Sequence, residues 1–416
     1  MNNASNEKEP LNMWERREEL PHVAGKHTIL AAAVCFLCAL GLPLCFANEW
    51  VALVLLAVLF IYVAIAIRSP ISVTMILVAT VICTMLGGFS IGAVFLALAV
   101  GTMTGAFLFT ASRLPYLTVL LPVAAACLEF AFVSDLRVAL LSLAFLPAAI
   151  LLALATLKGA ERTTAICFAE AGLVLVVLAV ILVVIRDAMG GLGRDAILTY
   201  IGNLRGELVN AVITVRDEVL ALANAGADAQ TKAAYDQMMA MLSNEMIADT
   251  VAQVFNLLPA IVLVICSIIA FFAQSMLNSA YYAVGLKDVL TPNARYFTMS
   301  VTAAVIYTLT FLLMIFVPSS SMVGAVVQNL CLILMPGLCI LGVQGLLVSL
   351  TRSRGGMRIF MVILIASMLC CYTSGALYIL AMWGAYDRVL FAIRKRMIEK
   401  LTQEGRNGSN GDVDGN

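Results

Sequence analysis

Residues 164–185 read TAICFAEAGLVLVVLAVILVVI, and this stretch decides the class of protein. At 1.5 Å per residue, a helix of this length crosses the roughly 30 Å hydrocarbon core of a bilayer. Its one charged residue is Glu170. Length and composition together predict a transmembrane helix rather than the buried helix of a soluble domain.

Nine further stretches of the same kind occur along the chain, and none of them contains Lys or Arg. They cover residues 29–46, 50–67, 71–86, 89–111, 116–133, 138–157, 251–273, 297–317 and 326–350. The 416-residue chain is 62% hydrophobic and 12% charged, whereas soluble domains are about 45–50% apolar and 25% charged. This composition excludes an ordinary soluble enzyme, a disordered protein and a nucleic-acid-binding protein. We expect an all-α, polytopic transmembrane helical bundle of about 10–12 spans, with the lipid bilayer as its partner.

The distribution of Lys and Arg orients the spans, because basic residues favour short cytoplasmic loops. With a cytoplasmic N-terminus, the short outer loops contain only Arg137. The cytoplasmic loops then contain Arg68, Arg113, Lys158, Arg162, Lys287, Arg295, Arg352, Arg354 and Arg358. Residues 359–393 form either one span or a hairpin of two helices, about 357–372 and 376–393. The hairpin is favoured, because it returns the basic run Arg394–Arg396 to the cytoplasm.

The pattern divides the chain into five segments. They are a cytosolic N-terminal tail (1–28), seven spans (29–185), an extracytoplasmic insertion (186–250), C-terminal membrane helices (251–396) and a disordered cytosolic tail (397–416). Within the insertion, apolar residues spaced by three and four predict an amphipathic helix over 196–223. A second helical stretch completes a hairpin. This hairpin packs on itself or on the outer surface, or it forms a lid or a surface for a partner.

Small residues recur at every fourth position in two of the spans. They are Ala31, Cys35 and Ala39 in the first, and Ala93, Ala97, Gly101 and Gly105 in the fourth. Such faces let helices approach closely, either inside the bundle or where another membrane subunit docks. The eleven cysteines all lie in apolar stretches, which is typical of small buried residues rather than of disulfides or metal ligands.

Polar side chains inside the spans are the candidates for a ligand or proton site. Two are carboxylates, Glu129 and Glu170, and a charge at mid-bilayer costs about 2.5–3.5 kcal/mol. Both lie about 6–9 Å from an interface, so snorkelling to the interface is the alternative. The neutral candidates, which could bind a small polar ligand or one another, are Gln253, Asn256, Gln274, Asn278, Asn329 and Gln344. The sequence contains no Gly-rich nucleotide loop and no catalytic triad that could be built in the membrane, so we expect neither an enzyme nor a cofactor or metal site.

Three motifs follow one another in the C-terminal part. They are Asn256-Leu-Leu-Pro259 with Gln274, Asn278 and Pro292; Asn329 and Pro336 with Val343-Gln344-Gly345; and Trp383-Gly384-Ala-Tyr-Asp387-Arg388 with the basic run. Their order over residues 250–396 resembles the YybS-like family of bacterial multi-pass membrane proteins. The resemblance implies the plasma membrane of a bacterium, and the distribution of Lys and Arg predicts that both chain ends lie in the cytoplasm.

The YybS-like family is remotely similar to the S components of energy-coupling-factor transporters. Those components capture a vitamin or a metal ion and dock on a coupling membrane subunit that is driven by ATPases. The face of Ala31, Cys35 and Ala39 resembles their docking face. The resemblance therefore implies binding or transport of a small solute, of unknown identity, without an ATPase of its own. The alternative is a non-transporting scaffold of the cell envelope that recruits partners through the 186–250 hairpin and the basic C-terminal tail.

Overall fold

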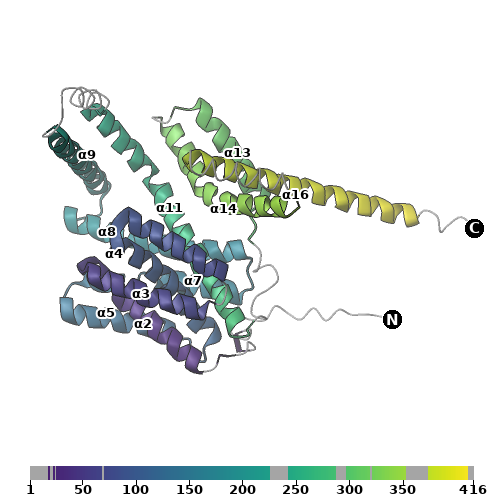
Figure 1. Ribbon diagram of the computed structural model, residues 1–416, viewed down its shortest axis with the longest axis horizontal. Helices are drawn as coiled ribbons and strands as arrows, with labels where there is room; N and C mark the ends of the chain where they lie inside the picture. Colours follow the sequence, from purple (N-terminus) through teal and green to yellow (C-terminus); the bar gives the residue numbers. More distant parts are fainter. Residues whose placement is uncertain are drawn as a thin grey trace, which may run out of the picture. The chain divides into compact units, whose positions relative to one another are not determined.

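The computed structural model describes residues 17–18, 22–23, 25–67, 70–224, 242–286, 297–318, 321–352 and 373–410. All regular structure in these ranges is helical, as Figure 1 shows, and no strand occurs among them. Eight described helices are long and apolar enough to cross a membrane. Two shorter apolar helices, α5 (Leu117–Val133) and α13 (Val301–Phe316), accompany them. The prediction of an all-α polytopic bundle is confirmed.

The chain forms two compact units. The first comprises Met1–Val180 and Ile265–Thr298, and the second comprises Ile181–Val264 and Met299–Asn416. The helices α8 (Arg162–Met189) and α11 (Asn244–Ala283) each contribute to both. The boundaries between the two units therefore lie within α8 and α11, whereas the hydropathy pattern changes at residues 185 and 250.

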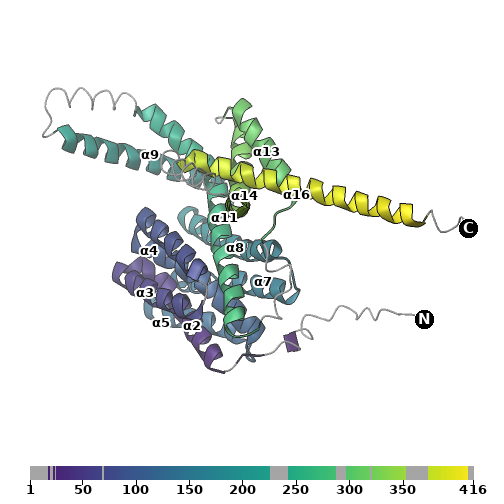
Figure 2. The ribbon, with the colours of Figure 1, turned by 45° about the vertical axis from the view of Figure 1, so that its right-hand side comes forward.

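The first unit is built on α2 (Gly25–Ala47), α3 (Glu49–Ala66), α4 (Pro70–Ala111) and α5, which pack side by side in Figures 1 and 2. Asn48 alone separates α2 from α3. Its side chain accepts a hydrogen bond of 2.8 Å from the Trp50 N–H and thereby caps α3. A single residue therefore connects the first two predicted spans.

Helix α4 is a hairpin of two helices. Gly87 and Gly88 leave the helical conformation, and Gly88 has a φ of 78°, which favours glycine. A Cβ on Gly92 would lie 3.2 Å from the Cβ of Thr84, although residues eight apart in a straight helix lie about 12 Å apart. The chain therefore reverses at the glycine pair, between the predicted spans 71–86 and 89–111.

The predicted span 138–157 is divided in the structure. It forms α6 (Leu136–Leu141) and α7 (Leu146–Leu157), with turns between them. Pro147 lies in the first turn of α7, where its missing N–H costs nothing, and it cannot continue a preceding helix. Phe145, in the break, is fully buried, and its ring packs against Gly101 of α4. A Cβ added at Gly101 would lie only 2.8 Å from that ring.

The small-residue faces lie inside the first unit. Ala31, Cys35 and Ala39 are 0–2% exposed. On α4, Ala93 and Ala97 are fully buried, and a Cβ on Gly105 would lie 2.8 Å from that of Ala149 in α7. These residues bring α2, α4 and α7 together, so in this chain they are occupied by internal packing.

In the second unit, α13 packs against α14 (Met322–Arg352) and α16 (Thr373–Asn410). Contacts between α14 and α16 advance in the same sense along both helices: Cys339 reaches Leu377, Gly342 reaches Leu380, and Gly345 reaches Trp383. The two helices therefore run parallel. They cross at Gly342 and Gly384, where each glycine faces the backbone of the other helix.

The parallel arrangement bears on the C-terminal hairpin. The first predicted arm, about 357–372, lies outside the described residues, and the second arm is the start of α16. Parallel helices end on the same side, so the end of α16 lies on the side of Arg352 at the end of α14. Helix α16 also continues to Asn410, through most of the tail predicted as disordered. Lys395 and Glu399, four residues apart, form an exposed ion pair of 3.9 Å on this part of the helix.

The N-terminal segment is docked on the first unit. The Arg17 side chain is 8% exposed and donates to the carbonyl oxygens of Phe109 (3.0 Å) and Ser112 (2.6 Å). The Val23 N–H donates to the Ala111 carbonyl at 3.0 Å. These bonds satisfy carbonyls at the C-terminal end of α4, where a cation is favoured by the helix dipole. Burial lowers the pKa of the Arg17 guanidinium, and the carboxylate of Glu18 opposes that change.

Candidate functional site

Glu129 is a carboxyl group inside the first unit. It lies on the face of α5 that also carries Thr118, Pro122 and Ala125, and it is 3% exposed. Thr118 donates to the Gly105 carbonyl at 3.0 Å, which directs this face toward α4. Glu129 lies eleven residues, or about 16 Å, further along the helix. Glu129 is therefore packed against protein over most of its surface, while its carboxyl oxygens are not among the fully enclosed polar atoms.

The Glu129 carboxyl has no hydrogen bond or ion pair with any residue that the structure describes. An isolated buried carboxylate is costly, so burial favours the neutral acid or the arrival of a cation. The same unit contains two buried hydroxyls without a partner among the described residues, those of Thr102 and Ser142. Sequence reasoning missed both, because Ser and Thr in a helix usually bond to a carbonyl of the preceding turn. Nothing local in the sequence distinguishes these two.

A second group of polar residues joins α8 to α11 within the first unit. Arg162 donates to Gln274 Oε1 at 3.0 Å and to the Ser275 hydroxyl at 2.7 Å, and it lies 5.3 Å from the ring centre of Phe271. Gln274 is 3% exposed. Asn278, one turn further, is half-buried and also engaged. Gln274 therefore connects α8 to α11 through Arg162, a partner that is not among the candidate amides.

Glu170 lies on the same side of α8, where this helix contacts α11. It is half-buried, and the hydroxyl of Ser267 on α11 lies near enough to its carboxyl to interact with it. Two helical turns separate Glu170 from Arg162 along α8. The two intramembrane carboxyls thus differ, because Glu170 has a partner from the neighbouring helix and Glu129 has none among the described residues.

The second unit contains a clamp around Pro259. The Asn329 side chain donates to the Asn256 carbonyl at 2.7 Å and accepts from the Ala260 N–H at 3.1 Å. In an uninterrupted helix this carbonyl and this N–H pair with each other. Proline disturbs the ladder of α11, and one amide from α14 satisfies both backbone groups at that point. Asn329 therefore has a structural partner.

The remaining candidates lie on exposed surfaces. Gln253, Gln344 and the side chain of Asn256 are exposed in the isolated chain. Gly345, next to Gln344, lies against Trp383 of α16, so two of the sequence motifs meet at the helix crossing. Within the described ranges, no three His, Cys, Asp or Glu side chains gather to hold a metal ion. The candidate residues thus fall into separate groups. Glu129 is the carboxylic acid among them whose residue is nearly fully buried and whose side chain makes no hydrogen bond to a described residue.

Comparison with known proteins finds no family model, curated protein or solved structure that matches the chain.

Proposed function

We propose that this integral membrane protein binds or transports a small solute, with no ATPase and no enzymatic activity of its own, and that Glu129 is its proton- or ligand-binding residue. The observation that carries the proposal is the 3% exposure of a carboxyl that no described residue satisfies. Ionisable groups inside membrane bundles mark ion and substrate pathways. The competing role, a carboxyl that reaches the interface, is disfavoured by its burial in protein.

The resemblance to the YybS-like family and, more remotely, to S components supports the same proposal. In that case a bacterial plasma membrane would be its location, and a coupling membrane subunit with ATPases would be its partner. The buried face around Cys35 does not favour docking through α2, so a coupling subunit would bind elsewhere on the bundle.

The test compares small molecules that co-purify with the protein in mild detergent, identified by mass spectrometry. Glu129→Gln removes the charge and keeps the shape, and Glu170→Gln is the matched control because the Glu170 carboxyl already has a partner. We expect a solute to remain with the wild type and with Glu170→Gln, and to be lost from Glu129→Gln. A solute retained equally by all three would exclude Glu129 as the binding residue.

A scaffold of the cell envelope is the second candidate. It is favoured by the basic turn Arg394–Arg396 on α16, which is exposed and carries two arginines without an ion pair among the described residues. Proteins that co-purify would separate the two functions. ATPases and a coupling subunit would support a capture component, and envelope proteins whose retention depends on this turn would support a scaffold.

A further inference from the structure

Helix α9 (Arg194–Asn224) carries an apolar stripe that no described residue covers. Its six central members are three or four residues apart and each is 40–58% exposed: Ile201, Leu204, Leu208, Val212, Val215 and Val219. Polar residues such as Asn203, Glu207 and Asn210 occupy the other side. An amphipathic helix needs a surface on which to bury such a stripe.

The helix is attached to the membrane helices at two points far apart along its length. At one end, only residues 190–193 separate it from α8, with Gly190 at a φ of 71°. Near the other end, Arg216 donates to the Leu242 carbonyl at 2.7 Å and to the Asn244 side chain at 2.8 Å, where α11 begins. Arg194 and Arg216 are 22 residues apart, or about 33 Å along the helix.

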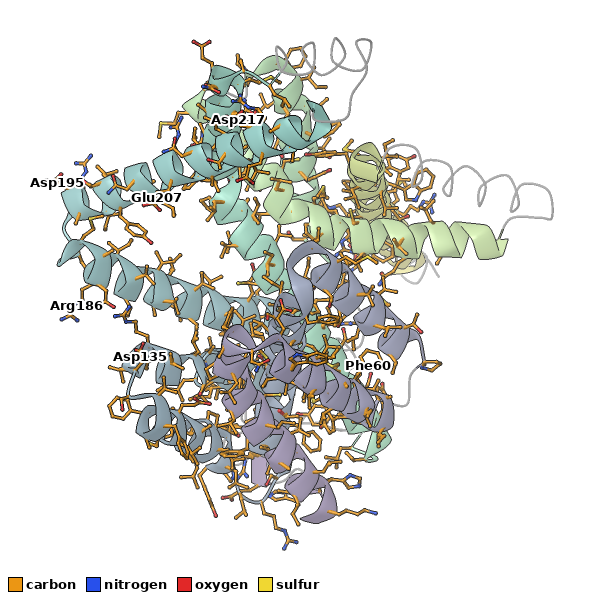
Figure 3. The ribbon with its side chains drawn as sticks, turned by 60° about the vertical axis from the view of Figure 1, so that its left-hand side comes forward. Phe60, Asp135, Arg186, Asp195, Glu207 and Asp217 are labelled. Atoms are coloured by element: carbon orange, nitrogen blue, oxygen red, sulfur yellow. The ribbon has the colours of Figure 1, made fainter. Side chains whose placement is uncertain are left out.

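Both attachments lie a short distance along their helices from the end of an apolar segment. The apolar part of α8 ends at Ile185, about 6 Å before the helix itself ends at Met189. The apolar part of α11 starts at Val251, about 10 Å after Asn244. The headgroup layer is about 5–7.5 Å thick on each side, so the end of α8 falls within it and Asn244 falls at its outer edge. A helix held at both ends at headgroup height runs along the bilayer surface rather than away from it. Figure 3 shows α9 leaving the end of α8 near Arg186 and Asp195 in a new direction.

The charges on α9 suit a phospholipid surface. Arg194, Arg205 and Arg216 are spaced by eleven residues, about three turns, and so form one line beside the stripe. The helix also carries Asp195, Glu207, Asp217 and Glu218, and Arg216 pairs with Asp217 at 2.8 Å, so Arg194 and Arg205 are the two arginines left to meet phosphate groups. Arg194 and Arg205 have no ion pair with any described residue, and such side chains can reach lipid phosphates from a buried stem. Glu207 is two residues from Arg205, about 200° around the helix, and therefore lies on the other side of the helix from this line.

We propose that α9 lies in the outer surface of the phospholipid bilayer, with its apolar stripe between the lipid headgroups and the upper acyl chains. A protein partner or a second copy of the chain is the rival occupant of the stripe. The lipid surface is favoured because both attachments already hold the helix at headgroup height. This inference does not depend on whether the protein transports a solute.

The test measures quenching of a single tryptophan by brominated lipids in the full-length protein. The native Trp14, Trp50 and Trp383 are replaced by Phe, and Val212→Trp or Asn210→Trp is added. The purified protein is reconstituted in phosphatidylethanolamine–phosphatidylglycerol vesicles brominated either near the headgroup or near the chain end. Positions 210 and 212 are neighbours in sequence but lie on opposite sides of the helix.

We expect bromine near the headgroup to reduce the fluorescence of Val212→Trp about twofold, as burial of 5–10 Å below the surface requires. Bromine near the chain end should reduce it less, and Asn210→Trp should respond to neither. Equal and weak quenching at both positions would overturn the proposal and would assign the stripe to a protein partner or to a second copy. If Val212→Trp does not give a monodisperse protein, Val215→Trp presents the same stripe and carries the same expectation.

Discussion

The crossing of α14 and α16 should not tolerate a single added methyl group. A Cβ on Gly384 would stand 2.8 Å from the Gly342 nitrogen, 3.0 Å from the Leu338 carbonyl carbon, and closer still to the Leu338 oxygen. All three are backbone atoms, so no side chain can rotate away. The helices must separate by at least about 0.6 Å, the difference between 2.8 Å and an ordinary contact of 3.4 Å.

That separation would loosen the cluster that joins the three helices, in which Tyr307, Cys331, Leu338 and Ala381 are fully buried. Overpacking of a close interior costs about 1–3 kcal/mol. The matched control is Gly206→Ala on α9, where a Cβ would meet nothing within 4 Å. Alanine there is expected to be neutral or to stabilise the helix by about 0.5–1 kcal/mol.

Thermal unfolding in detergent, followed with a thiol-reactive fluorophore, is a suitable assay because Cys331 is fully buried in this cluster. We expect Gly384→Ala to become reactive several degrees below the wild type, at about 2 °C or more for each kcal/mol. Gly206→Ala should react at the same temperature as the wild type or above it. If Gly384→Ala unfolds with the wild type, the two helices do not meet at these glycines and the parallel packing derived from them is refuted.

Two further predictions concern hydrogen bonds to backbone groups. Asn329→Leu leaves a carbonyl and an N–H of α11 without their partner, so it should destabilise the protein by about 1–3 kcal/mol in the same thermal assay. Gln253→Leu, at an exposed position, is the control and should not destabilise it. Equal effects of the two substitutions would show that the hydrogen bonds of Asn329 contribute nothing to stability. Arg17→Ala should free the N-terminal segment from α4, so that the amide of Val23 exchanges its hydrogen faster in deuterated buffer. The exposed Lys26→Ala should leave that rate unchanged, and unchanged exchange in both variants would contradict the docking.

Much of the fold follows from local patterns. Gly87-Gly88 between two apolar runs predicts the reversal inside α4, because a residue with a positive φ interrupts a helix and glycine adopts it without strain. The three-and-four spacing predicts a helix over 196–223, and α9 covers Arg194–Asn224. Pro147 predicts an interruption of the span 138–157, but the extent of the break over residues 142–145 was not predictable, because Leu143, Ala144 and Phe145 are as apolar as their flanks.

The candidate site was less predictable, because its chemistry depends on which helices are neighbours. Glu129 and Glu170 are equivalent on the sequence, and only the burial of one face of α5 and the position of Ser267 on α11 distinguish them. The pairing of Arg162 with Gln274 joins residues 112 apart. A hydropathy pattern identifies the polar residues within each span, but it does not show which residues of two neighbouring helices lie opposite each other.

The docking of the N-terminal segment has a consequence for biogenesis. Arg17 and the carbonyl of Phe109 are 92 residues apart in the chain, and all of α2, α3 and α4 lie between them. During synthesis, the N-terminal segment must wait until the end of the α4 hairpin has left the ribosome and entered the membrane. Contacts of such long separation form late. The hydrogen bonds between Arg17 and the end of α4 can therefore form only after α2, α3 and α4 have all been synthesised, and they tie the two ends of this three-helix segment together.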